Sequence, residues 1–151
     1  MRVKFRAARR EDVAAIVALF SDDILGHARE NNAELAPYLE AFEAIAQESH
    51  NEVIVGEDVQ GTIIATYQLT FISGLSLGAS RRAQIEGVRV AREMRGEGIG
   101  AAMLRDAEDR ARAAGCSLVQ LTMNSARDEA RRFYEREGFV ASHVGFKKPL
   151  D

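Results

Sequence analysis

The chain has 151 residues and a mass of 16.6 kDa, which predicts one domain, residues 1–151, large enough to bury a hydrophobic core. Hydrophobic residues make up 46% and charged residues 28%, as in ordinary globular proteins, and a formal net charge of −3 argues against nucleic acid as the main partner. No apolar run is long enough to cross a bilayer, and the basic start Met1–Lys4 leads into no signal-peptide apolar region, so we expect a cytoplasmic protein without a membrane partner.

The first predicted elements are a strand and two helices. Val3–Arg6 alternates between apolar and polar side chains, as a strand does. From Val13 to Ile24 the apolar residues recur at helical spacing, and Gly26 is the expected end of that helix. A second helical pattern begins near Pro37, which a first helical turn tolerates because the N–H of that position has no intrahelical partner.

A hairpin and a loop come next. Glu52–Val55 and Thr62–Ile72 are predicted to pair as strands through a glycine-containing turn. The loop Ser73–Ser80 is rich in glycine and serine but also carries Leu75 and Leu77. We expect these leucines to fold back onto the core; the alternative is that they form a surface for a partner or a substrate.

The centre of the chain combines a strand, a glycine-rich turn and a helix. Gln84–Val90 is a predicted strand in which Gly87 indicates a β-bulge. The stretch Arg95–Gly100 holds three glycines, and the following helix is predicted from Ile99 to Ala114. Glycines allow a tight turn that leaves the first amide groups of the helix bare, and the helix dipole adds positive character there. This end of the helix is therefore a predicted phosphate site.

Three interpretations of the glycine stretch compete. A Walker phosphate loop would close with Gly-Lys-Ser/Thr, and no such triplet occurs. A dinucleotide-binding fingerprint fits in its looser form through Gly96, Gly98 and Ala101, but only one further strand and helix pair follows it. The third interpretation is a turn that merely begins a surface helix.

The elements downstream complete the predicted order. Leu118–Met123 is a strand and Arg127–Arg136 a helix. Phe139–Ser142 and Gly145–Lys147 are predicted to form a short closing pair of strands. No internal repeat, linker or low-complexity segment divides the chain.

Two motifs carry a family resemblance. Arg95, Gly98 and Gly100 match the pattern Gln/Arg-x-x-Gly-x-Gly/Ala. A later pattern, Ala-x-x-x-Tyr-x-x-x-Gly-Phe, is matched by Ala130, Tyr134, Gly138 and Phe139. With both motifs in this order the chain resembles the GNAT superfamily of acetyl-CoA-dependent N-acetyltransferases. The resemblance implies an α/β fold with a central, splayed, mixed sheet of six to seven strands flanked by about four helices.

The resemblance also implies acetyl-CoA as co-substrate, with its pyrophosphate at the amides from Arg95 to Ala101 and its pantetheine arm along the preceding strand. The family usually has an asparagine three residues before the motif alanine, where this chain has Arg127, so Asn124 is considered as a substitute contact. The expected coenzyme-binding residues are Val88, Arg89, Val90, Arg95, Gly96, Glu97, Gly98, Ile99, Gly100, Ala101, Asn124 and Arg127.

Acetyl transfer to an amine requires a base for the amine and an acid for the leaving thiolate. Glu86 on the central strand is the candidate base, although in some relatives the base aligns with Gln84. A salt bridge from Glu86 to Arg82 or Arg89 is the structural alternative. Tyr134 is the candidate acid, and its alternative role is that of a core aromatic residue.

The acceptor amine and the partners are less clearly indicated. The implied fold admits the amine between Ser21–Asn32 and Ser73–Ser80, where Asp22, Asp23 and Glu30 would suit a cation. The resemblance also suggests a homodimer. A non-catalytic acyl-CoA-binding regulatory module is the rival function, and a nicotinamide-dependent oxidoreductase is a more distant one.

The cysteine and the histidines argue against a disulfide, a cysteine nucleophile and a metal site. Cys116 is the single cysteine, so no intrachain disulfide forms, and at the start of a predicted buried strand we expect it to be a core residue rather than a nucleophile. His27, His50 and His143 lack metal-ligand spacing, so no metal is expected.

Overall fold

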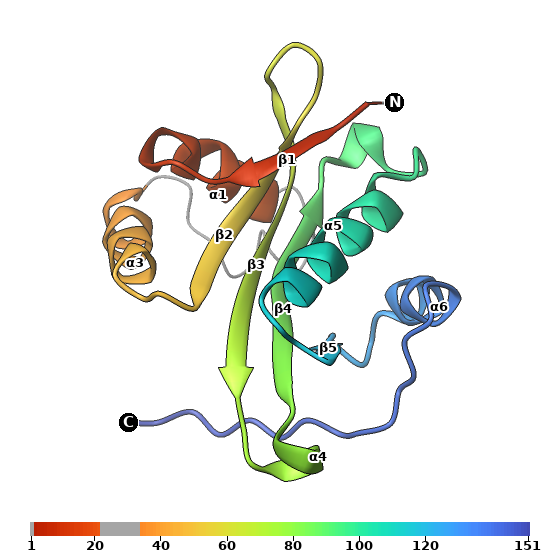
Figure 1. Ribbon diagram of the computed structural model, residues 1–151. Coiled ribbons are helices and arrows are strands. Elements are labelled where there is room, and N and C mark those ends of the chain that lie inside the picture. Colours follow the sequence, from red (N-terminus) through yellow and green to blue (C-terminus); the bar gives the residue numbers. More distant parts are fainter. Residues whose placement is uncertain (1, 22–33) are drawn as a thin grey trace. The chain divides into compact units, whose positions relative to one another are not determined.

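The computed structural model describes residues 2–21 and 34–151 (Figure 1). These residues form two compact units, one extending to Gln120 and one comprising Leu121–Asp151, and each is described by itself. The elements in chain order are β1 (Lys4–Ala7), η1 (Arg10–Asp12), α1 (Val13–Ser21), α3 (Ala36–Ala46), β2 (Asn51–Glu57), β3 (Ile63–Ser73), α4 (Ser76–Ala79), β4 (Arg81–Val90), η2 (Arg92–Met94), α5 (Ile99–Ala113), β5 (Leu118–Leu121) and α6 (Asp128–Arg136).

The strands form one mixed sheet in the order β1-β2-β3-β4-β5. The three pairs β1–β2, β2–β3 and β3–β4 are antiparallel. The N–H of Ser117 donates to the backbone carbonyl of Arg81 (2.8 Å). The side-chain amide of Gln120 donates to the side-chain oxygen of Gln84 (2.7 Å). Residue numbers in β4 and β5 therefore rise together, so β5 runs parallel to β4 and α5 is the crossover between them.

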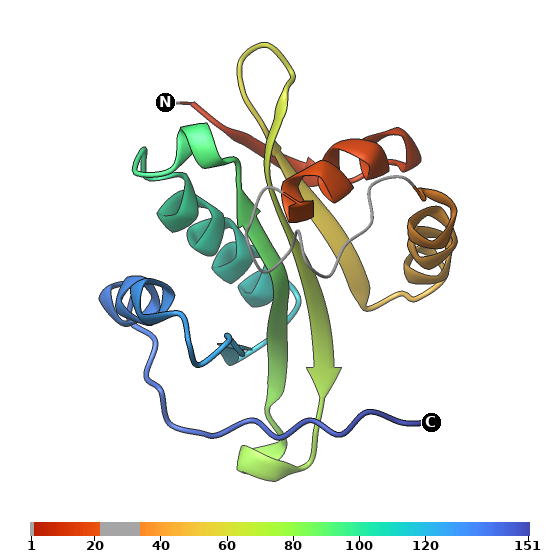
Figure 2. The ribbon, with the colours of Figure 1, turned by 180° about the vertical axis from the view of Figure 1, so that it is seen from behind.

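Helices cover both faces of the sheet in the first unit. Figures 1 and 2 show α1 and α3 on one face and α5 on the other. The apolar side chains of α5 recur at helical spacing and are almost fully buried against the sheet. They are Ile99, Met103, Leu104, Ala107 and Ala111. Alternate residues of β3, including Tyr67 and Leu69, complete this core. No helix of the described residues is long and apolar enough to span a bilayer.

The segment Ser73–Ser80, which was expected to be a loop with its leucines on the core, differs from that prediction. It contains the short helix α4, which projects beyond the ends of β3 and β4 in Figure 1. Leu75 and Leu77 are 95% and 72% exposed, so the expectation that they fold back onto the core is wrong. The reason is geometric, because a four-residue helix at the far end of a long hairpin has no core surface within reach of its side chains.

The second unit contains α6 and an extended C-terminal segment. Phe139–Ser142 and Gly145–Lys147 are not strands, so the predicted closing pair is wrong and the sheet has five strands in the described residues rather than six to seven. A strand requires a hydrogen-bonded neighbour, and alternation of side chains alone does not supply one. The predicted strand Leu118–Met123 also ends earlier, at Leu121, and Cys116 lies before it, half-buried instead of in the core.

Candidate functional site

The central strand β4 is bent by a β-bulge. Gln68 pairs with Glu86 and Thr66 pairs with Arg89, so Gly87 and Val88 together stand opposite one residue of β3. Gly87 has φ +61°, a conformation that favours glycine. The bulge predicted from the position of Gly87 in the sequence is confirmed.

In the part of the chain that the structure describes, no strand pairs with the outer edge of the second half of β4, which is called the open edge below. Because β5 has four residues and begins beside Arg81, it accompanies only the first half of the ten-residue β4. The N–H of Ala91 donates to Ile64 in β3, so by alternation the amides of Val88 and Val90 face away from β3, toward the open edge. The carbonyls of Val88 and Val90 on that edge accept hydrogen bonds from the side chains of Arg89 (2.9 Å) and Arg95 (3.3 Å), so the edge offers an extended ligand its outward amides.

The open edge leads through η2 into the glycine turn. Gly96 and Gly98 have φ of +84° and +79°, and Gly98 is the N-cap of α5. A Cβ atom at either position would meet nothing within 4 Å, so in this chain glycine is required by the backbone conformation and not by crowding. The first intrahelical bond of α5 is from Ala102 N–H to Gly98, so the amides just before Ala102 are free of intrahelical acceptors.

The electrostatics at this turn favour an anion. The helix dipole places partial positive charge at the first amides of α5, and Arg95 is exposed beside them. Arg95 Nε donates to the carbonyl oxygen of Val90 at 3.3 Å, which ties the turn to the end of β4. A depression of about 260 Å³ adjoins the start of the helix, and its lining includes Arg2, Glu97 and Gly98. Glu97 brings a negative charge to that lining, so its carboxylate would have to point away from a phosphate.

Glu86 projects toward the face covered by α1 and α3. It is directly opposite Gln68 in the sheet, and cross-strand partners share a face. Glu86 is exposed, and none of the ion pairs among the described residues involves it. The alternative of a salt bridge with Arg82 or Arg89 is therefore not supported. Gln84, the other position considered for the base, accepts a hydrogen bond from Gln120 (2.7 Å).

A cavity of about 160 Å³ lies on the same face, between α1, α3 and the sheet. Its mostly apolar lining includes Phe20, Phe42, Gln68 and Gly87. The guanidinium of Arg89 lies 5.5 Å from the centre of the Phe20 ring, a cation–π distance that fixes the end of α1 over the bulge. Because Gln68 and Gly87 are both neighbours of Glu86, the cavity approaches the candidate base from the helix side. The acidic residues predicted to attract an amine, Asp22, Asp23 and Glu30, lie outside the described residues.

The remaining predicted site residues belong to the second unit. Tyr134 is half-buried in α6 between two aromatic rings, with its ring centre 5.2 Å from that of Phe133 and 5.8 Å from that of Phe139. The Asn124 side chain accepts the N–H of Ala126 (2.9 Å) and so shapes the turn before α6. Arg127 is the N-cap residue of that helix.

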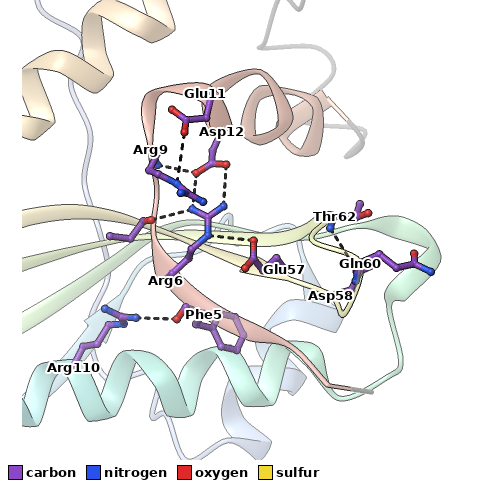
Figure 3. Close-up of polar contacts among 11 residues, drawn as sticks. Phe5, Arg6, Arg9, Glu11, Asp12, Glu57, Asp58, Gln60, Thr62 and Arg110 are labelled. Carbon is purple, nitrogen blue, oxygen red and sulfur yellow. Dashed lines mark hydrogen bonds and ion pairs between the residues drawn. The ribbon is translucent and has the colours of Figure 1, made fainter.

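Sequence reasoning missed the polar contacts that hold α5 to the sheet. The buried Tyr67 hydroxyl donates to Asp106 (2.5 Å), and Arg110 donates to the same carboxylate (2.8 Å) and to the Phe5 carbonyl (3.4 Å; Figure 3). Burial, and then the bond to Asp106, raise the pKa of Tyr67 well above its usual range. The i, i+4 spacing of Asp106 and Arg110 is visible in the sequence, but their link to a tyrosine in a distant strand is not.

A second missed network fixes the start of α1. Arg6 on β1 binds both oxygens of the buried Asp12 carboxylate (2.7 and 3.1 Å) and reaches Glu57 on β2 (3.2 Å; Figure 3). Asp12 also accepts the N–H of Arg9 (2.7 Å). The hydrogen bonds from Arg6 hold the pKa of Asp12 below its usual range.

Comparisons with known proteins agree on one family. The model described as "Acetyltransferase (GNAT) family" matches residues 20–139. Among curated proteins, the chain is 45% identical over 67 residues to an aminoalkylphosphonate N-acetyltransferase of Salmonella typhimurium. That match covers 44% of the length of each protein.

Solved structures match over nearly the whole chain. A protein titled as a transcriptional regulator from Bacillus halodurans C-125 is 39% identical with a TM-score of 0.93, and the match covers 99% of this chain and 100% of that one. A putative acetyltransferase from Agrobacterium tumefaciens is 25% identical with a TM-score of 0.84, covering 97% of this chain and 99% of that one.

Proposed function

This chain belongs to the GNAT acetyltransferase family, whose model matches residues 20–139, and from that premise we propose that residues 1–151 form one acetyl-CoA-dependent N-acetyltransferase domain acting on a primary amine. One observation carries the proposal: the open edge of β4, beyond its bulge, leads directly into a glycine turn that bares the amides of α5. An extended arm ending in a pyrophosphate requires these two features in this order.

In this proposal the glycine turn and β4 bind different parts of the coenzyme. The amides from Arg95 to Ala101 receive the pyrophosphate, with Arg95 as an added cation. Val88 and Val90 offer their outward amides to the pantetheine arm, as a neighbouring strand would. Asn124 and Arg127 are further proposed coenzyme contacts.

The chemistry follows from where Glu86 and these amides lie. Glu86 takes a proton from the acceptor amine, directly or through water, and the amine nitrogen then bonds to the thioester carbonyl carbon. An outward amide of β4 stabilises the oxyanion that forms on the carbonyl oxygen. As the carbon–sulfur bond breaks, Tyr134 protonates the leaving thiolate, and the acetylated amine is released. No covalent acetyl-enzyme is formed on this route.

The acceptor approaches from the face that carries α1 and α3. The exposed Glu86 carboxylate and the cavity beside Gln68 and Gly87 support this direction of entry. Because a curated relative is named for aminoalkylphosphonates, a small aminoalkylphosphonate is the first acceptor to assay. Polyamines, aminoglycosides, amino acids and peptide N-termini complete the panel.

The second candidate function is a non-catalytic acyl-CoA-binding regulatory module. A specific observation favours it: the Bacillus halodurans protein, similar over the whole chain, is titled as a transcriptional regulator. In such a module the glycine turn would still bind the coenzyme, but Glu86 and Tyr134 would have structural roles only.

Release of free thiol from acetyl-CoA in the presence of the amine panel separates the two functions. An enzyme releases thiol with at least one amine, and Tyr134→Phe lowers kcat while leaving coenzyme affinity unchanged. Tyr67→Phe is the matched control, because it removes the same hydroxyl from a tyrosine that anchors α5. Coenzyme binding without thiol release from any amine would favour the regulatory module.

A further inference from the structure

A network of polar side chains around Asn51 links the protein surface to the cavity between α1, α3 and the sheet. The side-chain nitrogen of Asn51 donates to the exposed Glu48 carboxylate (2.8 Å). The side-chain oxygen of Asn51 accepts from the side-chain nitrogen of Gln68 (2.9 Å) and from the Thr70 hydroxyl (3.1 Å). Gln68 lines the cavity and stands opposite Glu86 in the sheet. The Asn51 network therefore ends beside the candidate base.

The Glu48 carboxylate fixes the orientation of both amide side chains. A carboxylate only accepts hydrogen bonds, so Asn51 must turn its NH₂ group toward Glu48. The oxygen of Asn51 then faces β3, and Gln68 must meet it with its own NH₂ group. The Thr70 hydroxyl does not change this order, because a hydroxyl donates or accepts equally well. The side-chain oxygen of Gln68 is therefore directed away from Asn51.

This oxygen is the polar group that Gln68 offers to a ligand in the cavity. Within residues 2–21 and 34–151 it accepts no hydrogen bond. Two other polar residues of the lining already use their hydroxyl protons. Thr66 donates to the Ile54 carbonyl (2.9 Å), and Tyr67 donates to Asp106 (2.5 Å). Because the lining is mostly apolar, a ligand that covered the Gln68 oxygen without donating to it would lose binding free energy.

We propose that the Gln68 oxygen accepts a hydrogen bond from the N–H of the acceptor amine and holds its nitrogen beside Glu86. This proposal rests on the proposed function. Cross-strand partners have Cβ atoms about 4.5–5.5 Å apart, so the side chains of Gln68 and Glu86 are able to reach one nitrogen. The mostly apolar lining then surrounds the carbon atoms next to that nitrogen. Gln68 is an acceptor-binding residue, and Glu48 and Asn51 are positioning residues that act through it.

Steady-state kinetics with an amine that the unmodified protein acetylates provides the first test. Gln68→Leu removes the oxygen, so the KM for the amine should rise about 10–100-fold, the range expected for a lost hydrogen bond to a charged group. The KM for acetyl-CoA should stay unchanged, whereas a general distortion of the sheet would alter both constants. Thr70→Val is the matched control, because it also removes a donor to Asn51 but leaves the orientation of Gln68 intact.

A substitution at the protein surface tests the orientation itself. Lysine only donates hydrogen bonds, so Glu48→Lys should reverse Asn51 and then Gln68, placing an NH₂ group where the amine requires an acceptor. The KM for the amine should rise by about tenfold or more. In a protein that already carries Gln68→Leu, Glu48→Lys should have no further effect. Glu40→Lys makes the same charge change on the exposed side of α3, outside the Asn51 network, and should leave the KM unchanged.

The outcomes separate this proposal from the proposed function. Acetylation by the unmodified protein, with an unchanged KM for the amine in Gln68→Leu or in Glu48→Lys, would overturn the role of Gln68 alone. Failure of the unmodified protein to acetylate any amine would overturn the proposed function and this proposal with it. Because Glu48 is exposed, the Glu48→Lys variant remains decisive if Gln68→Leu does not fold.

Discussion

Separate replacement of Gly98 and Gly100 by alanine tests how the glycine turn is built. The two positions are neighbours in the same motif but differ in backbone conformation. Gly98 is the left-handed N-cap of α5, with φ +79° and no atom within 4 Å of an added Cβ. Gly100 lies in the first turn of α5, where the backbone is helical. The same substitution therefore encounters strain at one site and not at the other.

The expected magnitudes follow from these conformations. A left-handed conformation costs an L-residue about 1–2 kcal/mol, so Gly98→Ala should lower the free energy of unfolding by about that amount. Alanine is favoured over glycine in a helix by about 0.5–1 kcal/mol, so Gly100→Ala should raise it. The two variants should differ by about 2 kcal/mol. At about 2–4 °C per kcal/mol for a chain of this size, their melting temperatures should be separated by about 4–8 °C.

Thermal melting followed by circular dichroism measures this difference without any ligand. Gly100→Ala should melt above the unmodified protein and Gly98→Ala below it. If Gly98→Ala melted at or above Gly100→Ala, the left-handed turn would not be the reason for glycine at position 98, and the geometry assigned to the phosphate site would be refuted.

Three further substitutions test the networks and the base. Asp12→Asn should lower the free energy of unfolding by about 2–3 kcal/mol at neutral pH, because it weakens the hydrogen bonds to Arg6. Because the pKa of Asp12 is lowered in the folded protein, this difference between the variant and the unmodified protein should shrink as pH falls below about 4. Tyr67→Phe should lower the free energy of unfolding by about 1 kcal/mol at neutral pH. Because the pKa of Tyr67 is raised in the folded protein, the unmodified protein should lose this contribution as pH rises above about 10, and the variant should not. Denaturant titrations at a series of pH values measure the difference. Glu86→Gln should lower kcat by about 10²–10⁴-fold with unchanged melting temperature, since the side chain is exposed, and steady-state kinetics beside melting curves would show whether it does.

The parts of the fold that depend on local chemistry were predictable from the sequence. The bulge follows from a glycine inside a strand, and the start and end of α5 follow from glycines at positions that require positive φ. Gly115, with φ +79°, stands just after that helix as a left-handed cap should. These elements depend on a few adjacent residues, so the sequence alone is enough to predict them.

The parts that depend on contacts between distant residues were not predictable. Phe139–Ser142 has the alternation of a strand, but a strand forms only where a partner is present, and no sequence pattern names the partner. Leu75 and Leu77 were expected to fold back onto the core because they are apolar, whereas the projection of α4 beyond the sheet decides their exposure. The bond from Tyr67 to Asp106 spans 39 residues and has no local signature.

The candidate site also combines features that adjacent residues determine with features that depend on contacts between distant residues. The turn before α5, with Gly98 as its N-cap, could be predicted from the motif because the motif describes a local conformation. The position of Glu86 opposite Gln68, and the cavity that approaches it, depend on the register of β3 and on the packing of α1. The roles of Glu86 and Tyr134 in catalysis remain predictions that kinetics must decide.

Calorimetric titration with acetyl-CoA tests the central claim most directly, with Gly100→Glu and Gly100→Ala measured beside the unmodified protein. A glutamate in the first turn is compatible with the helix and its dipole, so Gly100→Glu should stay folded while its carboxylate repels the pyrophosphate. We predict a dissociation constant on the order of micromolar for the unmodified protein, comparable affinity for Gly100→Ala, and a loss of at least a hundredfold for Gly100→Glu. Absence of binding in the unmodified protein, or equal binding by Gly100→Glu, would contradict the assignment of the glycine turn as the coenzyme site.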